Sequence, residues 1–232
     1  MSGDARSAAW LWGPRLVALA IGLALAAGVH AQQPSEWVSL FDGKTISHWR
    51  GYKETGVPPG WKVQDGAITR VAEGPDLVSR EQYADFEFEW EWKVPPGGNS
   101  GVMFRVTEAL ESTYHSGPEY QLLDNALHSD GRNPFTSAAS SHSIAAPNHD
   151  MTKPVGQWNQ SRLLVKGSHV EHWLNGMKVV EYELWTPEWK ALVKASKFNQ
   201  WPEYGMQKSG HLVLQNHGDL VQFRNLRVRR LQ

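Results

Sequence analysis

Hydrophobic and polar residues alternate with a period of two along much of the chain. In residues 85–94 (DFEFEWEWKV) the aromatic residues and Val94 share one parity, while the charged residues occupy the other. Successive side chains of a β-strand point to opposite faces of its sheet, so this pattern predicts a strand with one buried face. Similar patterns predict further strands over residues 37–41, 61–64, 67–71, 101–106, 118–123, 161–166, 169–174, 177–183, 211–217 and 220–231.

Two local signals refine the strand pattern. Asp65-Gly66, between two of these strands, predicts a hairpin with a type I′ turn, in which both central residues have a positive φ. In the last strand the apolar residues change parity between Phe223 and Leu226. A β-bulge at or near Asn225 would let the apolar residues on both sides of it face the core.

One helix and one long irregular segment interrupt the strands. Thr186 followed by Pro187 is typical of an N-cap with proline at the first helical position, and predicts a helix over residues 188–197. Residues 125–160 follow neither period, and a loop of this length is usually functional or mobile. The whole pattern predicts a single all-β domain, a β-sandwich with one short helix.

The N-terminal segment has a different character. Basic residues precede an apolar run over residues 16–27, and small residues stand at the −3 and −1 positions of a cut after Ala31. A membrane span needs about 20 apolar residues, so the run is too short for an anchor. The segment predicts a signal peptide over residues 1–31 and a domain over residues 32–232 that is secreted or periplasmic, without stable membrane insertion.

Composition excludes several classes of function. The 232 residues include 23 Lys and Arg against 24 Asp and Glu, a balance that argues against a nucleic-acid-binding protein. The absence of Cys excludes disulfides, thiolate catalysis and Cys-ligated zinc. The 12 Trp are the unusual feature, because exposed Trp side chains stack on sugar rings whereas buried ones fill cores.

Polar residues are expected to gather on one face of the sheet. The apolar residues expected to pack inside three of the strands are Val102, Phe104, Val106, Tyr120, Leu122, Leu212 and Leu214. The residues then left on the opposite face are Arg105, Glu119, Gln121, Gln215 and His217. Such a polar group on an open sheet face would suit a sugar-sized cleft, and a plain solvated face is the alternative.

Several short motifs occur together in a recognisable order. They are Leu40–Lys44 (LFDGK), Gly98–Gly101 (GNSG), Gly117–Leu122 (GPEYQL), Lys166–Gly176 (KGSHVEHWLNG), Leu214–Gly218 (LQNHG) and Phe223–Asn225 (FRN). Over about residues 36–231 the chain resembles the bacterial 3-keto-disaccharide hydrolase family, also described as 3-keto-glucoside 1,2-lyases and 3-keto-2-hydroxy-glucal hydratases. The resemblance implies a concanavalin A-like jelly roll acting on oxidised sugars. Asn216 departs from the family, which often has Asp there.

The resemblance implies an elimination followed by hydration. A ketone at C3 acidifies the C2 proton, a base removes it, and the enolate expels the C1 oxygen; water then adds to the glucal. This needs an acid/base group and a donor for the enolate oxygen. The candidate catalytic residues are Glu119, His172 and His217, and the candidate substrate-binding residues are Asn99, Arg105, Gln121, Asp124, Gln215 and Trp173. His172 shares the parity of apolar neighbours, so a core histidine remains an equal alternative.

Cofactors and partners follow from the same residues. The His residues are scattered, without a His-x-His or His-Glu-x-x-His motif, so we predict no cofactor. A divalent metal that polarises the ketone remains a lesser alternative. The expected partner is a 3-keto-sugar or another carbohydrate, and the sequence does not predict an oligomeric state.

Two other functions remain open at this point. A non-catalytic, lectin-like carbohydrate-binding module would suit the sandwich and the Trp content equally well. A conventional retaining glycosidase is the second alternative, because residues 87–91 (EFEWE) imitate the E-x-D-x-E strand of laminarinase-like enzymes. Alternate carboxylates on a strand lie about 7 Å apart, however, whereas a retaining pair needs about 5–5.5 Å. A solvated strand face therefore explains these residues better.

Overall fold

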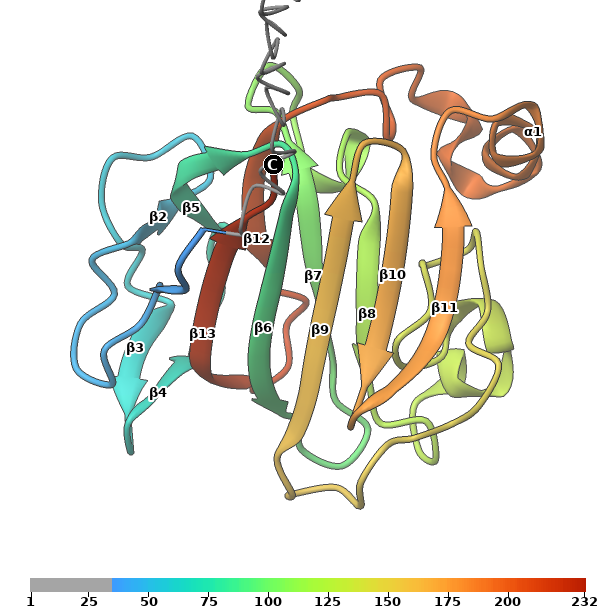
Figure 1. Ribbon diagram of the computed structural model, residues 1–232. Helices are drawn as coiled ribbons and strands as arrows, with labels where there is room; N and C mark the ends of the chain where they lie inside the picture. Colours follow the sequence, from blue (N-terminus) through green and yellow to red (C-terminus); the bar gives the residue numbers. More distant parts are fainter. Residues whose placement is uncertain (1–34) are drawn as a thin grey trace, which may run out of the picture. The chain divides into compact units, whose positions relative to one another are not determined.

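The computed structural model describes residues 35–232, so the predicted signal peptide lies outside the described residues. Two antiparallel sheets stack face to face (Figure 1). Sheet A contains β1 (Val38–Ser39), β3 (Trp61–Gln64), β4 (Ala67–Arg70), β6 (Phe86–Lys93), β9 (Asn159–Lys166), β10 (His169–Leu174), β11 (Met177–Glu183) and β13 (Gln222–Arg230). Sheet B contains β2 (Trp49–Gly51), β5 (Leu77–Tyr83), β7 (Asn99–Val106), β8 (Glu119–Leu123) and β12 (Gly210–Leu214).

The order of the strands follows a jelly-roll sandwich, as predicted. Sheet A runs β11-β10-β9-β6-β13-β4-β3, with β1 paired to β13, and sheet B runs β2-β5-β12-β7-β8. In the described part of the chain, one α-helix lies outside the sheets, α1 (Pro187–Ala195), together with the short 3₁₀ helices η1 (Thr113–His115), η2 (Ser129–Arg132), η3 (Pro134–Thr136) and η4 (Lys197–Gln200). Within residues 35–232 no helix has the length and apolar character to cross a membrane.

Strand alternation builds the core, as the pattern in β6 shows. Phe86, Phe88, Trp90 and Trp92 are all buried between the sheets, and the Phe88 and Trp90 rings stack with centroids 4.9 Å apart. An aromatic side chain buries a large apolar area, so this single strand anchors much of the core. The predicted sandwich core is therefore confirmed at its most strongly patterned strand.

Two predicted irregularities are present. Asp65 and Gly66 have φ values of 50° and 72°, as a type I′ turn between β3 and β4 requires. Asn225 has a φ of 53°, and the pairing of β13 with β6 shifts register there. Because the bulge adds one residue to the strand, Phe223 and Leu226 both face the core despite their opposite parity.

A second bulge, which was not predicted, corrects the expected orientation of β7. Arg105 has a φ of 51°, and the register between β12 and β7 shifts beside it. Val102 lies in the main core, but Val106 joins Met103 in a second apolar cluster on the outer side of sheet B. The expectation that Val106 packs with Val102 is wrong, because the extra residue reverses the parity of the end of the strand.

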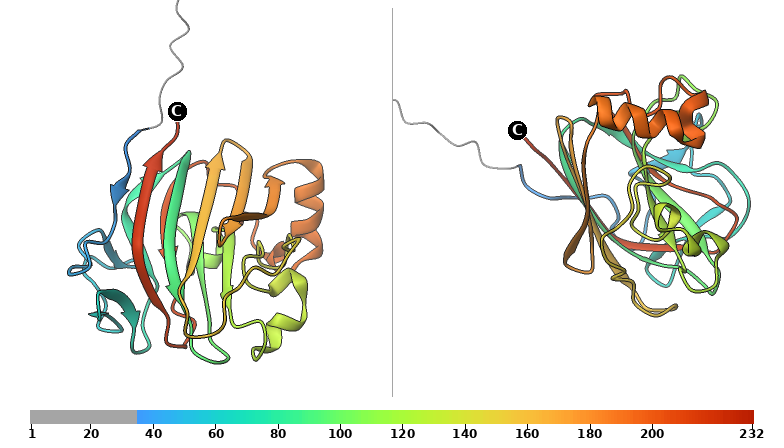
Figure 2. Two further views of the ribbon diagram at one scale, coloured as in Figure 1. Left: turned by 60° about the horizontal axis from the view of Figure 1, so that its bottom comes forward. Right: turned by 90° about the vertical axis from the view of Figure 1, so that its right-hand side faces the viewer.

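The segment after β8 follows the edge of sheet B. The main chain forms isolated bridges between Tyr120 and Ser141 and between Ser141 and Ala145. Gln121 and Ser140 are also joined, through an N–H to carbonyl bond of 3.1 Å. Residues 138–145 thus lie alongside β8 and form an irregular edge of sheet B. Figure 2 shows this part of the chain (yellow-green) and α1 (orange) on the β8 side of the sandwich.

Candidate functional site

Strand register places three of the predicted site residues on one face. On β7 and β8, Gly101 pairs with Gln121 and Met103 pairs with Glu119. Gln215, just after β12, donates its backbone N–H to the Gly101 carbonyl at 2.9 Å. Glu119, Gln121 and Gln215 therefore share the outer face of sheet B, as predicted. Glycine at position 101 is needed, because a Cβ atom there would overlap the Glu119 carboxylate.

Glu119 is a buried carboxyl group with a perturbed acidity. Its side chain is only 5% exposed, and burial raises its pKa to about 7. The positive charge of Lys197 and a hydrogen bond from Gln215 oppose this rise, whereas the charge of Asp76 adds to it. A carboxyl group with a pKa near the working pH can both accept and donate a proton during a reaction, as a general acid/base must.

His142 and Lys197 lie beside Glu119, and sequence reasoning missed both. The His142 N–H donates to the Glu119 carbonyl at 3.0 Å, which makes the two residues neighbours across the irregular edge. The His142 ring is buried, and its Nε2 lies 2.8 Å from Lys197 Nζ. Burial and the Lys197 charge lower the pKa of His142 to about 4. His142 lies in the long irregular segment and Lys197 at the end of the predicted helix, and neither position carries a sequence signal that connects it with Glu119.

A second carboxyl group, Asp76, lies near His217 and was also missed. Asp76 accepts hydrogen bonds from the Asn216 N–H at 2.7 Å and from Thr113 Oγ1 at 2.5 Å. Burial raises the pKa of Asp76, and the charge of His217 opposes the rise. β12 ends at Leu214, so a loop rather than the predicted strand carries the exposed His217 to this place.

Unpartnered polar atoms surround the two carboxyl groups. The buried polar atoms without a hydrogen-bond partner in residues 35–232 include Asn99 Oδ1, Gln121 Oε1, Ser140 Oγ, His142 Nδ1, Tyr204 Oη and Gln215 Oε1. Leaving such groups unpaired is costly, and a hydroxyl-rich ligand would pair them. We call Asp76, Asn99, Glu119, Gln121, Ser140, His142, Lys197, Tyr204, Gln215 and His217 the Glu119 cluster.

Arg105, predicted to bind substrate, does not join the Glu119 cluster. The bulge described above turns its side chain toward the end of the sandwich. Its guanidinium donates to the carbonyls of Ala84, at 2.7 Å, and Gly167, at 2.9 Å, and it pairs with Asp85 at 3.1 Å. The predicted orientation beside Glu119 is wrong, and the contacts make Arg105 a structural link from β7 to the β5–β6 connection and to the β9–β10 turn.

His172, a predicted catalytic residue, is a core histidine. Its side chain is fully buried, its ring stacks on Tyr120 with centroids 4.7 Å apart, and its Nδ1 donates to the Ala139 carbonyl at 2.9 Å. Burial lowers its pKa to about 4, so the ring is neutral and its Nδ1–H is committed to the backbone. Strand parity had left a core histidine as an equal alternative to a catalytic one, and the core histidine is what the structure shows.

Asp124 and Trp173 are also placed away from the Glu119 cluster. The Asp124 oxygens accept backbone N–H groups of Gly97, at 2.8 Å, and Ala126, at 3.0 Å, so this carboxylate fixes a turn. Trp173 lies on the outer face of sheet A, where its ring packs against the Arg162 guanidinium at 3.9 Å. The two outer faces of a sandwich are separated by both sheets, so Trp173 cannot form a wall beside Glu119.

The departure at Asn216 also falls outside the cluster. Its Oδ1 accepts from Arg70 Nε at 2.7 Å, and its Nδ2 donates to the Ala72 carbonyl at 3.1 Å. Only the backbone of Asn216 reaches the cluster, through the bond to Asp76. An amide in place of the carboxylate therefore changes a loop contact and leaves the polar groups around Glu119 as they are.

The acidic strand that suggested a retaining glycosidase is neutralised by arginines. Glu87 pairs with Arg162 at 2.9 Å and with Arg229. Glu89 pairs with Arg227 at 2.5 Å, and Glu91 pairs with Arg224 at 2.7 Å. A nucleophile and an acid would both need to be free to react, so this row functions as a set of ion pairs.

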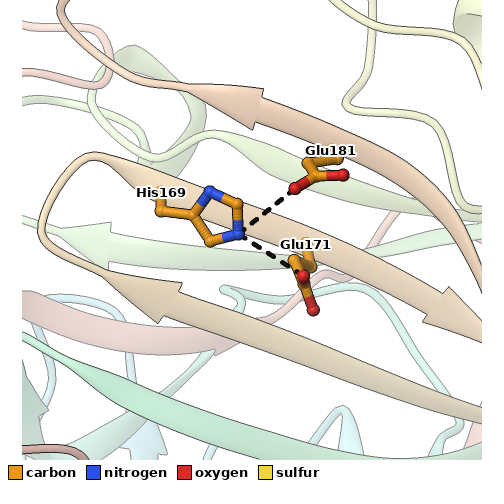
Figure 3. A group of neighbouring side chains, drawn as sticks. All are labelled: His169, Glu171 and Glu181. Atoms are coloured by element: carbon orange, nitrogen blue, oxygen red, sulfur yellow. Dashed lines mark hydrogen bonds and ion pairs between the residues drawn. The ribbon is translucent and has the colours of Figure 1, made fainter.

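A histidine and two glutamates form a second group on β10 and β11 (Figure 3). Nε2 of His169 lies 3.4 Å from Glu171 and 3.6 Å from Glu181. Among the residues described, this is the one group with the spacing of metal ligands. Lys178 pairs with Glu171 at 3.1 Å and with Glu181 at 2.7 Å, so a single protein ammonium already contacts both carboxylates.

A cavity of about 680 Å³ lies at the C-terminal end of β8, lined by Leu123, Pro147 and Asp150 among others. Glu119 is not among its lining residues. Burial opposes the change, but hydrogen bonds from Thr152 and Asn125 lower the pKa of Asp150, which makes this carboxyl group a poor acid near neutral pH. Glu119, whose pKa is about 7, therefore lies outside this cavity.

Comparisons with known proteins agree on the family and the fold of this chain. Residues 36–229 match the family model of the 3-keto-alpha-glucoside-1,2-lyase-like domain. A 3-keto-disaccharide hydrolase of Bacteroides thetaiotaomicron is 37% identical over 225 residues, covering 83% of this chain and 78% of that protein. A crystal structure of a candidate glycosyl hydrolase from Parabacteroides distasonis superimposes with a TM-score of 0.80 at 31% identity, covering 84% of this chain and 94% of the other. An endo-β-1,3(4)-glucanase of family GH16 shares the fold alone, with a TM-score of 0.50 at 10% identity and coverage of 86% and 93%.

Proposed function

The chain belongs to the 3-keto-alpha-glucoside-1,2-lyase-like family, and from this premise we propose that it cleaves 3-keto-disaccharides and related 3-keto-glycosides. The observation that carries the proposal is Glu119, a buried carboxyl group with a pKa of about 7 among unpartnered polar atoms. The name of the Bacteroides relative supports the substrate class. The proposed net reaction is hydrolysis, by elimination and then hydration.

In the proposed first step Glu119 removes the C2 proton of the 3-keto sugar. The electrons of the C2–H bond form the C2=C3 bond of an enolate, and the negative charge moves to the C3 oxygen. When the enolate collapses, the C1–O bond breaks and the leaving oxygen takes a proton from an acid of the site. We assign the supply of that proton to Glu119, now protonated, or to His217.

In the second step water adds across the double bond of the 2-hydroxy-3-keto-glucal. Its oxygen bonds to C1, and C2 regains a proton, so the sum of the two steps is hydrolysis of the glycosidic bond. Neutral amides suit the recognition of the sugar, because they donate and accept without bringing a fixed charge. Asn99, Gln121 and Gln215 are assigned this part, since each has an unpartnered buried oxygen.

The location of the protein is a separate proposal. Residues 1–31 have the features of a signal peptide, so we propose that the enzyme acts outside the cytoplasm, in the periplasm or in the medium. Cell fractionation followed by mass determination of the intact protein tests this. Removal of residues 1–31, with a new N-terminus at Gln32, is the expected result; a full-length cytoplasmic protein would contradict it.

A product assay tests the proposed activity. Purified enzyme would be offered 3-keto-trehalose beside trehalose, with and without EDTA, and Glu119→Gln and Glu89→Gln would be compared. Cleavage of the keto sugar alone is expected, with Glu119→Gln slowed about 10²–10⁴-fold, the usual contribution of a general acid/base. Glu89→Gln is the matched control, since Glu89 pairs with Arg227 on the other outer face.

Other outcomes of that assay separate the alternatives. Cleavage of unoxidised trehalose would favour a conventional glycosidase and contradict the elimination. Binding of the keto sugar without cleavage would favour a lectin-like module, in which Glu119→Gln should weaken binding only modestly. Loss of cleavage in EDTA would add a metal ion to the reaction.

A further inference from the structure

The elimination requires one group that the assignments above leave open. A donor must stabilise the charge that develops on the C3 oxygen of the enolate, and such donors are often the largest contributors to catalysis. Arg105 was the cation expected from the sequence. Its guanidinium is occupied by the carbonyls of Ala84 and Gly167 and lies outside the Glu119 cluster, so we look for the donor within that cluster.

The contact between Lys197 and His142 determines where the imidazole carries its proton. A lysine ammonium has three N–H donors and no acceptor, so at 2.8 Å it can only donate to the His142 ring. Nε2 must then be the accepting nitrogen. In a neutral imidazole the other nitrogen carries the hydrogen, which makes Nδ1–H the donor of this ring. The low pKa of His142 keeps the ring neutral at working pH.

The resulting N–H group is buried and has no partner. Nδ1 of His142 is among the unpartnered buried atoms, whereas the rest of the residue is held by the backbone bond to Glu119 and by Lys197. A neutral ring with Nδ1–H and with Nε2 occupied cannot accept a proton. Its remaining capability at Nδ1 is to donate a hydrogen bond to an oxygen.

We propose that His142, held in the Nδ1–H form by Lys197, donates a hydrogen bond to the C3 oxygen of the sugar and stabilises the enolate. This inference rests on the function proposed above and adds a residue to it. His142 is a catalytic residue in this scheme, and Lys197 is a positioning residue that fixes the tautomer and supplies a nearby positive charge. Lys197 is the first residue of η4 and is exposed, so its aliphatic stem connects the surface with the cluster.

Nuclear magnetic resonance tests the tautomer without reference to activity. Protein labelled with ¹⁵N-histidine would be examined by long-range ¹H–¹⁵N correlation, and the His142 signals identified by their loss in His142→Gln. The expected result is a protonated Nδ1 and an unprotonated Nε2 at pH 7. In Lys197→Met the ring loses its donor, so the protonated nitrogen is expected to change to Nε2 in part or all of the population. Wild-type protein with the proton on Nε2 would overturn the proposal.

Kinetics on the keto sugar tests the role in catalysis. His142→Phe keeps a flat ring but removes the donor, and is expected to lower kcat about 10²–10³-fold with KM nearly unchanged. His142→Gln retains an N–H donor and is expected to recover at least about tenfold of that loss. Thermal unfolding of each variant confirms that it is folded. Equal activity of His142→Phe and wild type would overturn the proposal.

The two readouts separate this inference from the function on which it rests. If the wild-type enzyme cleaves the keto sugar and His142→Phe does so equally well, the function stands and the role of His142 fails. If the wild-type enzyme does not cleave the keto sugar while its Nδ1 is protonated, the function fails and the catalytic role fails with it, although the Lys197 contact is confirmed.

Discussion

The two outer faces of the sandwich are both polar but are built differently. On sheet A every glutamate of β6 has an arginine partner, for example Glu89 with Arg227 at 2.5 Å. On sheet B the polar residues are mostly neutral and buried, and Gln121 and Gln215 each have an oxygen without a partner. On the outer face of sheet A, the glutamates of β6 all have their ion-pair partners within the protein. The outer face of sheet B lacks partners for its polar groups, which is what a binding site for a polar ligand requires.

The comparison shows that a charge row in a sequence is a poor guide to a site. The alternating glutamates of β6 give the strongest acidic signal in the chain, yet each is satisfied within the fold. Glu119 stands alone in its motif, but burial among amides raises its pKa to about 7. Unsatisfied burial, rather than the number of charges, distinguishes the candidate site.

The largest effect expected from this difference is a pH-dependent gain in stability for Glu119→Gln. The pKa of Glu119 is raised to about 7 in the folded protein from an ordinary value of 4.5, so the unfolded chain loses its proton first as pH rises. Wild-type stability should therefore fall between about pH 4.5 and 7, by up to about 3 kcal/mol, while the amide of the variant has no proton to lose in this range. Denaturant unfolding at pH 4 to 8 measures it.

The groups around Glu119 shift its pKa in both directions, and the pH dependence of the stability difference tests the net shift. Lys197 lowers the pKa of Glu119, whereas Asp76 and Asp130 raise it, and Gln215 donates to the carboxylate. The difference in unfolding free energy between Glu119→Gln and wild type should be near zero at pH 4 and largest at pH 8. A difference that is constant with pH would show that Glu119 is an ordinary carboxylate.

A smaller, opposite effect is expected on sheet A from Glu87→Gln. Its side chain is 3% exposed and pairs with Arg162 and Arg229, so the substitution leaves two guanidinium groups without an anion. A loss of about 2 kcal/mol is expected, less than for a fully buried pair because both arginines are partly exposed. Activity on the keto sugar should stay within about twofold of wild type, as is usual for changes distant from a site.

Glu89→Gln is the matched comparison on the same strand. Arg227, its partner, is half exposed, and exposed pairs contribute about 0–1 kcal/mol. The loss of stability should therefore be below that of Glu87→Gln in the same unfolding experiment. If Glu87→Gln reduced kcat as strongly as Glu119→Gln, the distinction between the faces would fail.

The smallest effect is expected for Trp173→Phe. The substitution removes the indole N–H bond to Glu171 at 2.7 Å and weakens the contact with Arg162, which together are worth about 1 kcal/mol. Because Trp173 lies on sheet A, KM for the keto sugar should be unchanged. A clear rise in KM would indicate that the sugar contacts the outer face of sheet A, and would contradict the assignment of substrate binding to sheet B.

Much of the fold could be predicted because it depends on local rules. The period of β6, the positive φ of Asp65 and Gly66 and the bulge at Asn225 all follow from side-chain direction or turn sterics within a few residues. The bulge at Arg105 could not be predicted in this way, since Arg105 continues the alternation of its strand without interruption. Its parity changes only because β12 pairs with a shifted register.

The site was predicted in part. Glu119, Gln121 and Gln215 have parities that register preserves, which is why strand reasoning located them on one face. Arg105, His172, Asp124 and Trp173 have plausible side chains but lie in other environments, respectively a bulge, the core, a turn and the opposite outer face. Local sequence does not show to which of the two sheets a strand belongs, and therefore on which outer face of the sandwich its polar residues lie.

The sequence by itself determined the sandwich and the face on which Glu119 stands, because alternation and turn chemistry act over short distances. The family followed from the resemblance of its ordered motifs. The tertiary structure alone decided the acidity of Glu119 and the identity of its neighbours. Asp76, His142 and Lys197 come from three separate segments, and His142 reaches Glu119 only because residues 138–145 lie along β8. Burial and electrostatic coupling depend on distances in space, and those distances exist only once the chain has folded.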